Sequence, residues 1–319
     1  MNRSRSGDSD SAQSEAAAAA HPSTRSRAIL WMLAGSLLVT VMAALVKTLG
    51  SRLPAVELAG VRAVFLVAAL LPFMLRRPSG AFVTHQPGLL LLRAAALATV
   101  NALGFWTLTV LPLVYVTSIS FTKPLFVTLL AVLLLGERLR LRRSLATLAG
   151  FAGVLVMLNP RTIAFGSTEV WAAFAALGVA LSMAIGVILV KTLSETDRPS
   201  TIIFYSNLGV VALLAIPTAL FWVTPSAQEW GLLILLGLVG LAGQNCFIRS
   251  YRAAEASFVA PFEYVRILTA AAVGYLVFAE IPDVWTGIGA AIIAASTLYL
   301  AHRERMLEKR RANAAIRDD

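Results

Sequence analysis

The stretch Leu45-Val46-Lys47-Thr48-Leu49 recurs without change at positions 189–193, a displacement of 144 residues. Leucine and valine coincide easily in an apolar chain, but this chain has only four lysines, and two of them lie in the matched pentapeptide. A second set of matches follows at a displacement of 143: Tyr115 falls on Phe258, Phe121 on Tyr264, Lys123 on Arg266 and Glu137 on Glu280. Two sets of matches at nearly equal displacements predict that one segment was duplicated to build the chain.

The composition places this duplicated chain in a membrane. Apolar residues make up 58% of the 319 residues, charged residues make up 14%, and the mean hydropathy is +0.77. Crossing roughly 30 Å of hydrocarbon takes about 20 mostly apolar residues, which must be helical because lipid cannot hydrogen-bond free backbone groups. We therefore expect an all-α integral membrane protein with ten transmembrane helices, at about 28–48, 55–75, 88–109, 113–135, 144–160, 169–190, 201–222, 229–250, 256–279 and 284–302.

The two ends of the chain are polar. Residues 1–27 are rich in Ser, Ala, Asp and Arg without an apolar period, which predicts a disordered tail. Residues 303–319 carry mixed charge and are expected to form a C-terminal tail, with a helical extension of the last span as the alternative. Between them lie two repeats of five helices each, 28–160 and 169–302. Connections are too short for a further domain, and the single cysteine, Cys246, excludes an internal disulfide.

The arginines indicate the orientation. Segments on one side of the expected spans are rich in arginine, as are both tails, whereas the last two loops on the other side contain no Lys or Arg. The positive-inside rule therefore places both termini in the cytoplasm. The net charge of +10 reflects this asymmetry, so anionic lipid headgroups are expected as its partners and nucleic acid is not. The abundance of Ala and Arg favours a bacterial inner membrane.

An odd number of spans in each half has a geometric consequence. The second half enters the membrane from the opposite side, so a pseudo-two-fold axis in the membrane plane relates the halves. Equivalent residues then meet near mid-depth. Exchanging the conformations of the halves produces two states of similar energy, each open to a different side, as alternating access requires.

Three stretches resemble a known family: Phe121–Glu137, Gly150–Val154 and Ala253–Tyr264. They are similar to the fourth helix and later segments of the EamA family, in the drug/metabolite transporter superfamily. The resemblance extends over about 28–302. It implies two inverted five-helix EamA repeats around a central cavity lined by the third, fourth, eighth and ninth helices with parts of the first and sixth. It also implies transport of small metabolites, inward in some members and outward in others.

Two cations are expected in the middle of spans, where charge costs roughly 2.5–3.5 kcal/mol on insertion scales. Lys123 lies in the fourth span and Arg266 occupies the matched position in the ninth. One interpretation is that both bind an anionic group of a solute, a carboxylate or phosphate. The other is that Glu263, three residues before Arg266, neutralises it and only holds helices together. Pro124 interrupts the hydrogen-bond ladder beside Lys123, which would free a carbonyl.

Amides and aromatic rings surround these charges. Asn101 and Gln244 match each other in the third and eighth spans and serve either as hydrogen-bond partners of a solute or as contacts between helices. Phe121 and Tyr264 are matched two residues before the cations, and with Trp106 they are candidates to stack on a planar solute. Core packing is the alternative for each ring.

Arg62 in the second span is a further candidate for the solute path. Glu137 and Glu280 end matched helices at opposite surfaces, where they are candidate gates that pair across the boundary between repeats; an ordinary interfacial role is the alternative.

These residues predict a secondary-active or facilitative transporter of a small organic metabolite that is anionic or zwitterionic. The alternatives are an exporter of apolar or planar compounds and a membrane protein that is not a carrier, such as a channel. An enzyme is not expected, because no HExxH or GxSxG motif and no cluster of metal ligands occurs, and no cofactor is implied. Proton coupling through Glu263 and homodimerisation are both left open.

Overall fold

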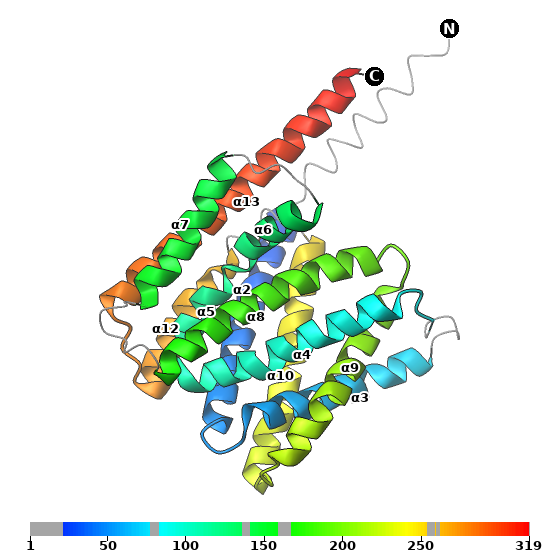
Figure 1. The fold of residues 1–319 in the computed structure, drawn as a ribbon, viewed down its shortest axis with the longest axis vertical. Coiled ribbons are helices and arrows are strands. Elements are labelled where there is room, and N and C mark those ends of the chain that lie inside the picture. The colour runs from blue at the N-terminus through cyan, green and yellow to red at the C-terminus, as the bar shows by residue number, and fades with distance from the viewer. Residues whose placement is uncertain are drawn as a thin grey trace.

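The computed structural model describes residues 22–76, 83–135, 141–158, 167–253, 259 and 262–318. These residues form helices joined by short connections, and no strand occurs among them. The helices are α2 (Pro22–Leu49), α3 (Ala55–Leu75), α4 (Pro87–Val110), α5 (Leu113–Ser120), α6 (Lys123–Leu135), α7 (Leu141–Leu158), α8 (Thr168–Leu193), α9 (Pro199–Leu220), α10 (Ala227–Ala253), α12 (Val265–Phe278) and α13 (Val284–Asp318) (Figure 1).

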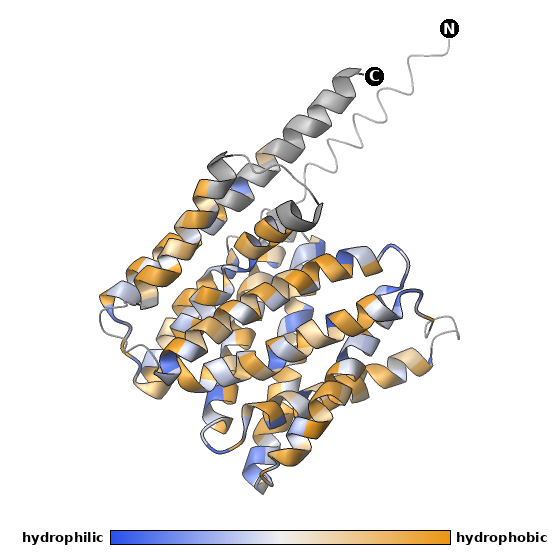
Figure 2. Ribbon diagram, in the orientation of Figure 1, coloured by the Kyte–Doolittle hydropathy of each residue, from blue (hydrophilic) through white to orange (hydrophobic). Residues whose placement is uncertain are grey.

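Seven apolar segments within the described residues are long enough to cross a membrane: Ser26–Leu49, Ala55–Pro72, Pro87–Val110, Leu113–Leu130, Thr168–Leu193, Pro199–Leu220 and Ala227–Ala253. Three shorter apolar helices, Leu148–Met157, Val265–Phe278 and Val284–Tyr299, lie within the remaining expected spans. Apolar residues run along the helices, and hydrophilic residues gather at their ends and connections (Figure 2). The chain is therefore a multi-pass helical membrane protein.

Prolines lie in the first turns of three helices. Pro87 and Pro199 lie in the first turns of α4 and α9, where a missing N–H has no helical partner to lose. Pro22 likewise begins α2, so residues 22–27 are helical although we expected them to belong to a disordered tail. At the other end, α13 continues to Asp318, which agrees with the alternative of a helical extension for the C-terminal segment.

The most extensive contacts between helices join the two matched halves. The helix α2 packs on α10, and the helix α4 packs on α8. These two contacts are reciprocal, because α2 and α8 carry the two copies of the pentapeptide, and α4 and α10 carry the matched amides Asn101 and Gln244. The remaining large contacts pair α3 with α9 and α7 with α13, and the latter two helices lie side by side in Figure 1.

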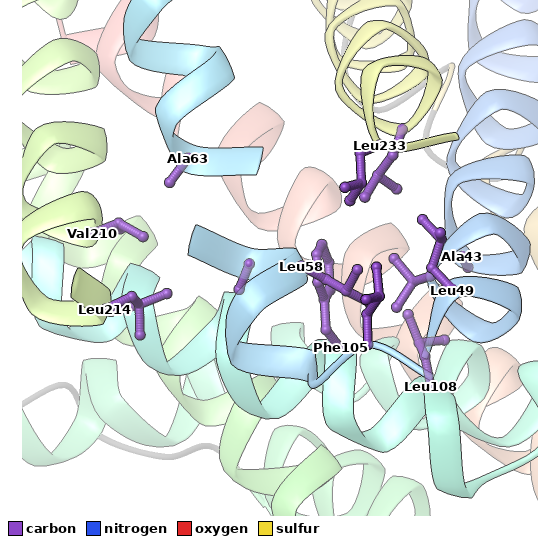
Figure 3. Packing of buried hydrophobic residues seen from close by; sticks show 14 of the residues in the cluster. Ala43, Leu49, Leu58, Ala63, Phe105, Leu108, Val210, Leu214 and Leu233 are labelled. Atoms are coloured by element: carbon purple, nitrogen blue, oxygen red, sulfur yellow. The ribbon is translucent and has the colours of Figure 1, made fainter. Parts of the chain in front are cut away.

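One buried cluster contains residues of seven described helices: α2, α3, α4, α5, α9, α10 and α12 (Figure 3). Leu49, Leu58, Phe105, Leu214 and Leu233 reach it from α2, α3, α4, α9 and α10 respectively. Because helices from both halves contribute, the two halves share this part of the core.

Candidate functional site

The fourth expected span is interrupted in the middle. Phe121 and Thr122 form a turn between α5 and α6, and the N–H groups of both residues bond to carbonyls only three residues earlier. Pro124 has no N–H to continue the ladder. The hydroxyl of Thr297 on α13 donates to the carbonyl of Phe121 at 3.2 Å. The carbonyl freed by the break is thus satisfied by a neighbouring helix.

The ninth expected span has its interruption at the matched position. Tyr264 forms a turn immediately before α12, and the N–H of Ile267 bonds to the Tyr264 carbonyl at 3.0 Å. The rings of Phe121 and Tyr264 stack on each other, with centroids 4.4 Å apart and planes inclined by 16°. Each ring therefore has the other as its stacking partner, and both belong to one buried apolar cluster, which agrees with the alternative of core packing. Their role in binding a solute stays a prediction.

Arg266 lies against this stack. Its guanidinium carbon is 4.7 Å from the centroid of the Phe121 ring, close enough for a cation–π contact. One Nη donates to the hydroxyl of Ser120 at 2.9 Å, and the other lies 3.8 Å from a carboxylate oxygen of Glu263. Arg266 on α12 therefore contacts the break between α5 and α6 in the other half of the chain, and its ion pair with Glu263 is loose.

Glu263 and Lys123 have different surroundings. The hydroxyl of Tyr251 on α10 donates to Glu263 at 3.4 Å, so the carboxylate has two weak partners. Lys123 is half-buried at the start of α6, and its ammonium has no hydrogen-bond or ion-pair partner among the described residues. Sequence reasoning had missed Ser120 and Tyr251, which carry no charge; the match of Ser120 with Glu263 was the signal that could have found the first.

A second cation lies on α3. Arg62 donates to the side-chain oxygen of Asn101 at 2.7 Å, and its guanidinium carbon is 5.9 Å from the centroid of Phe105. The Asn101 amide in turn donates to the carbonyl of Leu97 at 2.7 Å, which orients its oxygen toward Arg62. The structure thus brings together two residues that sequence reasoning had considered separately.

Three arginines in the described helices have guanidinium groups with an unsatisfied nitrogen: Arg62 on α3, Arg93 on α4 and Arg266 on α12. The Nε atoms of Arg62, Arg93 and Arg266 are buried and have no hydrogen-bond partner within the described part of the chain. Arg62 and Arg93 also have no ion pair with a described carboxylate; Arg93 donates to the carbonyl of Gly186 at 3.2 Å. Buried donors are normally satisfied, so these groups leave positive charge and hydrogen-bonding capacity available inside the bundle.

Glu280 is bound across the boundary between the halves. It follows Ala279, whose φ of 54° lies in the left-handed region and turns the chain at the end of α12. One carboxylate oxygen is 2.5 Å from the ammonium of Lys47, and the other accepts from the N–H of Leu113 at 2.9 Å. Lys47 also donates to the carbonyl of Leu111 at 2.8 Å. The partner of Glu280 is therefore the lysine of the first pentapeptide, which sequence reasoning had not assigned to it.

The other candidates are placed less centrally. Trp106 is half-buried and packs on a cluster with Ala172 and Ala173 of α8, as a core residue does. Gln244 is exposed and makes no hydrogen bond within the described residues, unlike its match Asn101. Glu137 lies outside the described residues.

Two polar junctions connect the helix ends. Arg52 binds Glu229 through two hydrogen bonds of 2.7 Å. In the second junction, Asp197 accepts from the hydroxyl of Thr84 at 2.5 Å and from the N–H of His85 at 2.9 Å. Burial opposes the ionisation of Asp197, but these hydrogen bonds outweigh it and hold the pKa of this carboxyl below its ordinary value.

Helices of two matched halves, packed reciprocally with cations at their breaks, define a membrane protein of internally duplicated architecture. The model of the EamA-like transporter family matches the chain twice, over residues 26–159 and 170–301. The chain belongs to this family, within the drug/metabolite transporter superfamily, and is a transporter rather than an enzyme.

Curated relatives cover nearly the whole chain. An S-adenosylmethionine uptake transporter of Rickettsia prowazekii is 31% identical, over 87% of this chain and 93% of that protein. A riboflavin transporter of Vibrio cholerae is 30% identical (90% and 96%), and a pseudopaline exporter of Pseudomonas aeruginosa is also 30% identical (87% and 96%). A crystal structure with 22% sequence identity superimposes with a TM-score of 0.59, over 87% of this chain and 98% of the other, and so shares the fold.

Proposed function

We propose that this chain carries a small organic metabolite with an anionic or zwitterionic group across the bacterial inner membrane, by alternating access. The observation that carries the proposal is the surplus of positive charge at the helix breaks. Lys123 has no partner among the described residues, and Arg266 has one hydroxyl and a carboxylate at 3.8 Å. An unneutralised cation in a span is costly, so an anionic group of a solute that pairs with it offsets this cost and binds favourably.

The relatives support a metabolite and leave its identity open. Their names include an uptake transporter and an exporter at nearly the same identity to this chain, so similarity selects neither a direction nor a solute. S-Adenosylmethionine and riboflavin, which two of these names give, both contain fused heteroaromatic rings, and Trp106, half-buried on α4, is a ring that has no stacking partner among the described residues. A planar or apolar solute moving outward is therefore the second candidate function.

The architecture that we propose has ten spans in two inverted repeats, 28–160 and 169–302, with both termini in the cytoplasm. The reciprocal packing of α2 on α10 and of α8 on α4 supports a two-fold relation between the halves. The odd number of spans in each half makes that axis lie in the membrane plane, and the distribution of arginines supports the orientation.

Access at the two ends requires gates, and we assign one to Glu280. Its ion pair with Lys47 joins the end of α12 to α2, and its bond with Leu113 joins α12 to the start of α5. This set of contacts closes the end of the bundle where both helices terminate. Glu137, the match of Glu280, is the proposed gate residue of the opposite end.

Purified protein tests the proposal directly. A thermal-shift screen against metabolites identifies a solute, since a ligand that binds only the folded state raises the melting temperature. Liposome counterflow with that solute should then be saturable and lost in Lys123→Ala and Arg266→Ala. The matched control is Arg249→Ala, because Arg249 is exposed and also lies over an aromatic ring, Trp31, at 4.9 Å. Full transport by both site variants would refute the cationic site.

Coupling to protons is a separate part of the proposal. Glu263 lies 3.8 Å from Arg266 and accepts from the Tyr251 hydroxyl at 3.4 Å, so its carboxylate is only weakly held. Uptake driven by a pH gradient should fail in Glu263→Gln while counterflow persists. Unchanged gradient-driven uptake in that variant would remove protons from the mechanism.

A further inference from the structure

Residues beside the two helix breaks correspond to one another through the displacement of 143. Ser120 corresponds to Glu263, Phe121 to Tyr264, and Lys123 to Arg266. In a transporter of inverted repeats the two end states arise when the halves exchange conformations, so each contact of one state predicts a corresponding contact of the other. This step rests on the alternating access proposed above.

Applying the correspondence to the observed contacts produces a specific arrangement for the second state. The bond from Arg266 to Ser120, at 2.9 Å, becomes a bond from Lys123 to Glu263. The position of Arg266 over Phe121 becomes a position of Lys123 over Tyr264. The stack of Phe121 on Tyr264 corresponds to itself and remains.

We infer that Glu263 is handed from Arg266 to Lys123 when the transporter changes state, with the Phe121–Tyr264 stack as the pivot. In the state described here, Arg266 is held by the protein through Ser120, Phe121 and Glu263, and Lys123 is the available cation. In the second state Lys123 is held by Glu263, and Arg266 becomes available. Each state therefore offers one cation to the anionic group of the solute, first from one half and then from the other.

The exchange accounts for two features of this site. Glu263 lies 3.8 Å from Arg266 and 3.4 Å from the Tyr251 hydroxyl, so its present partners hold it loosely and do not prevent its transfer. Lys123 has no partner among the described residues, although it is half-buried in a span, where a cation without a partner is costly. An ion pair formed in the second state offsets that cost.

The exchange and a purely structural Glu263–Arg266 pair predict opposite effects of Glu263→Gln on the population of the two states. If Glu263 served only to neutralise Arg266, then Glu263→Gln would weaken the present state. Under the exchange, Glu263→Gln and Lys123→Met both remove the ion pair of the second state. Glu263→Gln also removes the contact with Arg266 in the present state, but at 3.8 Å that contact is the weaker of the two, so both variants shift the population toward the present state. Because both remove the same interaction, the double variant should shift it no further than either single variant.

A cysteine reporter measures this population in detergent micelles. Leu111→Cys, in a Cys246→Ser background, places a thiol on the residue whose carbonyl accepts from Lys47, where the native side chain is 3% exposed. Its rate of reaction with a polar maleimide follows the fraction of molecules open at this end. Ser51→Cys, at an exposed position, is the control for reagent and folding and should react equally in every variant.

We expect Glu263→Gln and Lys123→Met each to slow labelling of the reporter by about tenfold, the net effect of one charge-assisted hydrogen bond. The double variant should match the slower single variant. Ser120→Ala should speed labelling, since it removes the 2.9 Å bond to Arg266 that stabilises the present state. Faster labelling in Glu263→Gln, unchanged labelling, or additive effects would overturn the exchange; Lys123→Gln repeats the test if the methionine variant does not fold.

The same assay separates this inference from the proposed function. A reporter that never reacts in the parent protein, with or without solute, would count against alternating access itself. A reporter that reacts in the parent protein and is insensitive to Glu263 and Lys123 would leave alternating access intact and refute only the exchange.

Discussion

Substitution of Lys47 should show how much the ion pair between Lys47 and Glu280 contributes to the free energy of unfolding. Lys47 and Glu280 have side chains only 17% and 13% exposed, and their charged atoms are 2.5 Å apart. Removing one member of a buried pair costs about 3–5 kcal/mol, because the other charge is left without a partner. Glu280 keeps the N–H of Leu113 at 2.9 Å and some contact with solvent, so we expect Lys47→Met to cost about 2–4 kcal/mol.

The complementary variant removes the other charge. In Glu280→Gln the amide oxygen can still accept from Leu113, so the cost should be lower, about 1–3 kcal/mol. A true ion pair makes the double variant less unstable than the sum of the singles, by about 1–2 kcal/mol. Reversible unfolding in mixed detergent micelles, with titrated denaturing detergent, measures all three free energies.

The ion pair between Arg52 and Glu229, at the protein surface, is the control for these double-variant measurements. Arg52 and Glu229 make the same kind of contact, but the Arg52 side chain is 50% exposed. Its coupling should be small and should fall as salt is raised, whereas the coupling of Lys47 with Glu280 should resist salt. Additive single effects at Lys47 and Glu280, within about 0.5 kcal/mol, would show that the two residues do not stabilise each other and would refute the gate assignment.

Two further predictions concern packing and pH. Gly289→Ala should destabilise the protein by about 1–3 kcal/mol, because the added methyl would lie 2.7 Å from the backbone nitrogen of Met157; its control, Gly287→Ala, has open space around it and should not destabilise in the same unfolding assay. Asp197 has a lowered pKa, so its stabilising contribution is complete above the unfolded value of about 3.8 and is lost as the pH falls through the folded value. The difference in stability between the parent protein and Asp197→Asn should therefore be constant near neutral pH and shrink below about pH 4, as measured by melting temperature; a difference that grows on acidification would contradict the role assigned to the bonds from His85.

Several features of the site could be predicted from the amino-acid sequence alone. The displacement of 143 identified Phe121 and Tyr264 as a matched pair, and matched residues of a two-fold arrangement meet where the axis passes. Pro124 indicated the break in the fourth span. The break and the meeting of the two rings could be predicted because they depend on backbone chemistry and on equivalence within the chain, whereas the binding roles of these residues stay predictions.

Other predictions failed to anticipate partners. Glu57 lies in the first turn of α3, and its carboxylate accepts from the N–H of Val223, 166 positions away, a partner that nothing in the sequence indicates. Arg62 and Asn101 were treated apart, although they bind each other at 2.7 Å. Gln244, the match of Asn101, is exposed, so equivalence in sequence did not ensure equal surroundings.

The amino-acid sequence by itself determined that this is a helical membrane protein with a duplicated segment, because the length of an apolar run and the recurrence of rare residues are properties of the chain. Only the tertiary structure decided which charges are paired. Lys47 binds Glu280 and Arg266 reaches Ser120 across 233 and 146 positions respectively, and such contacts depend on how helices from both halves pack in one shared core. A repeat specifies which positions are equivalent, whereas packing specifies which of them touch.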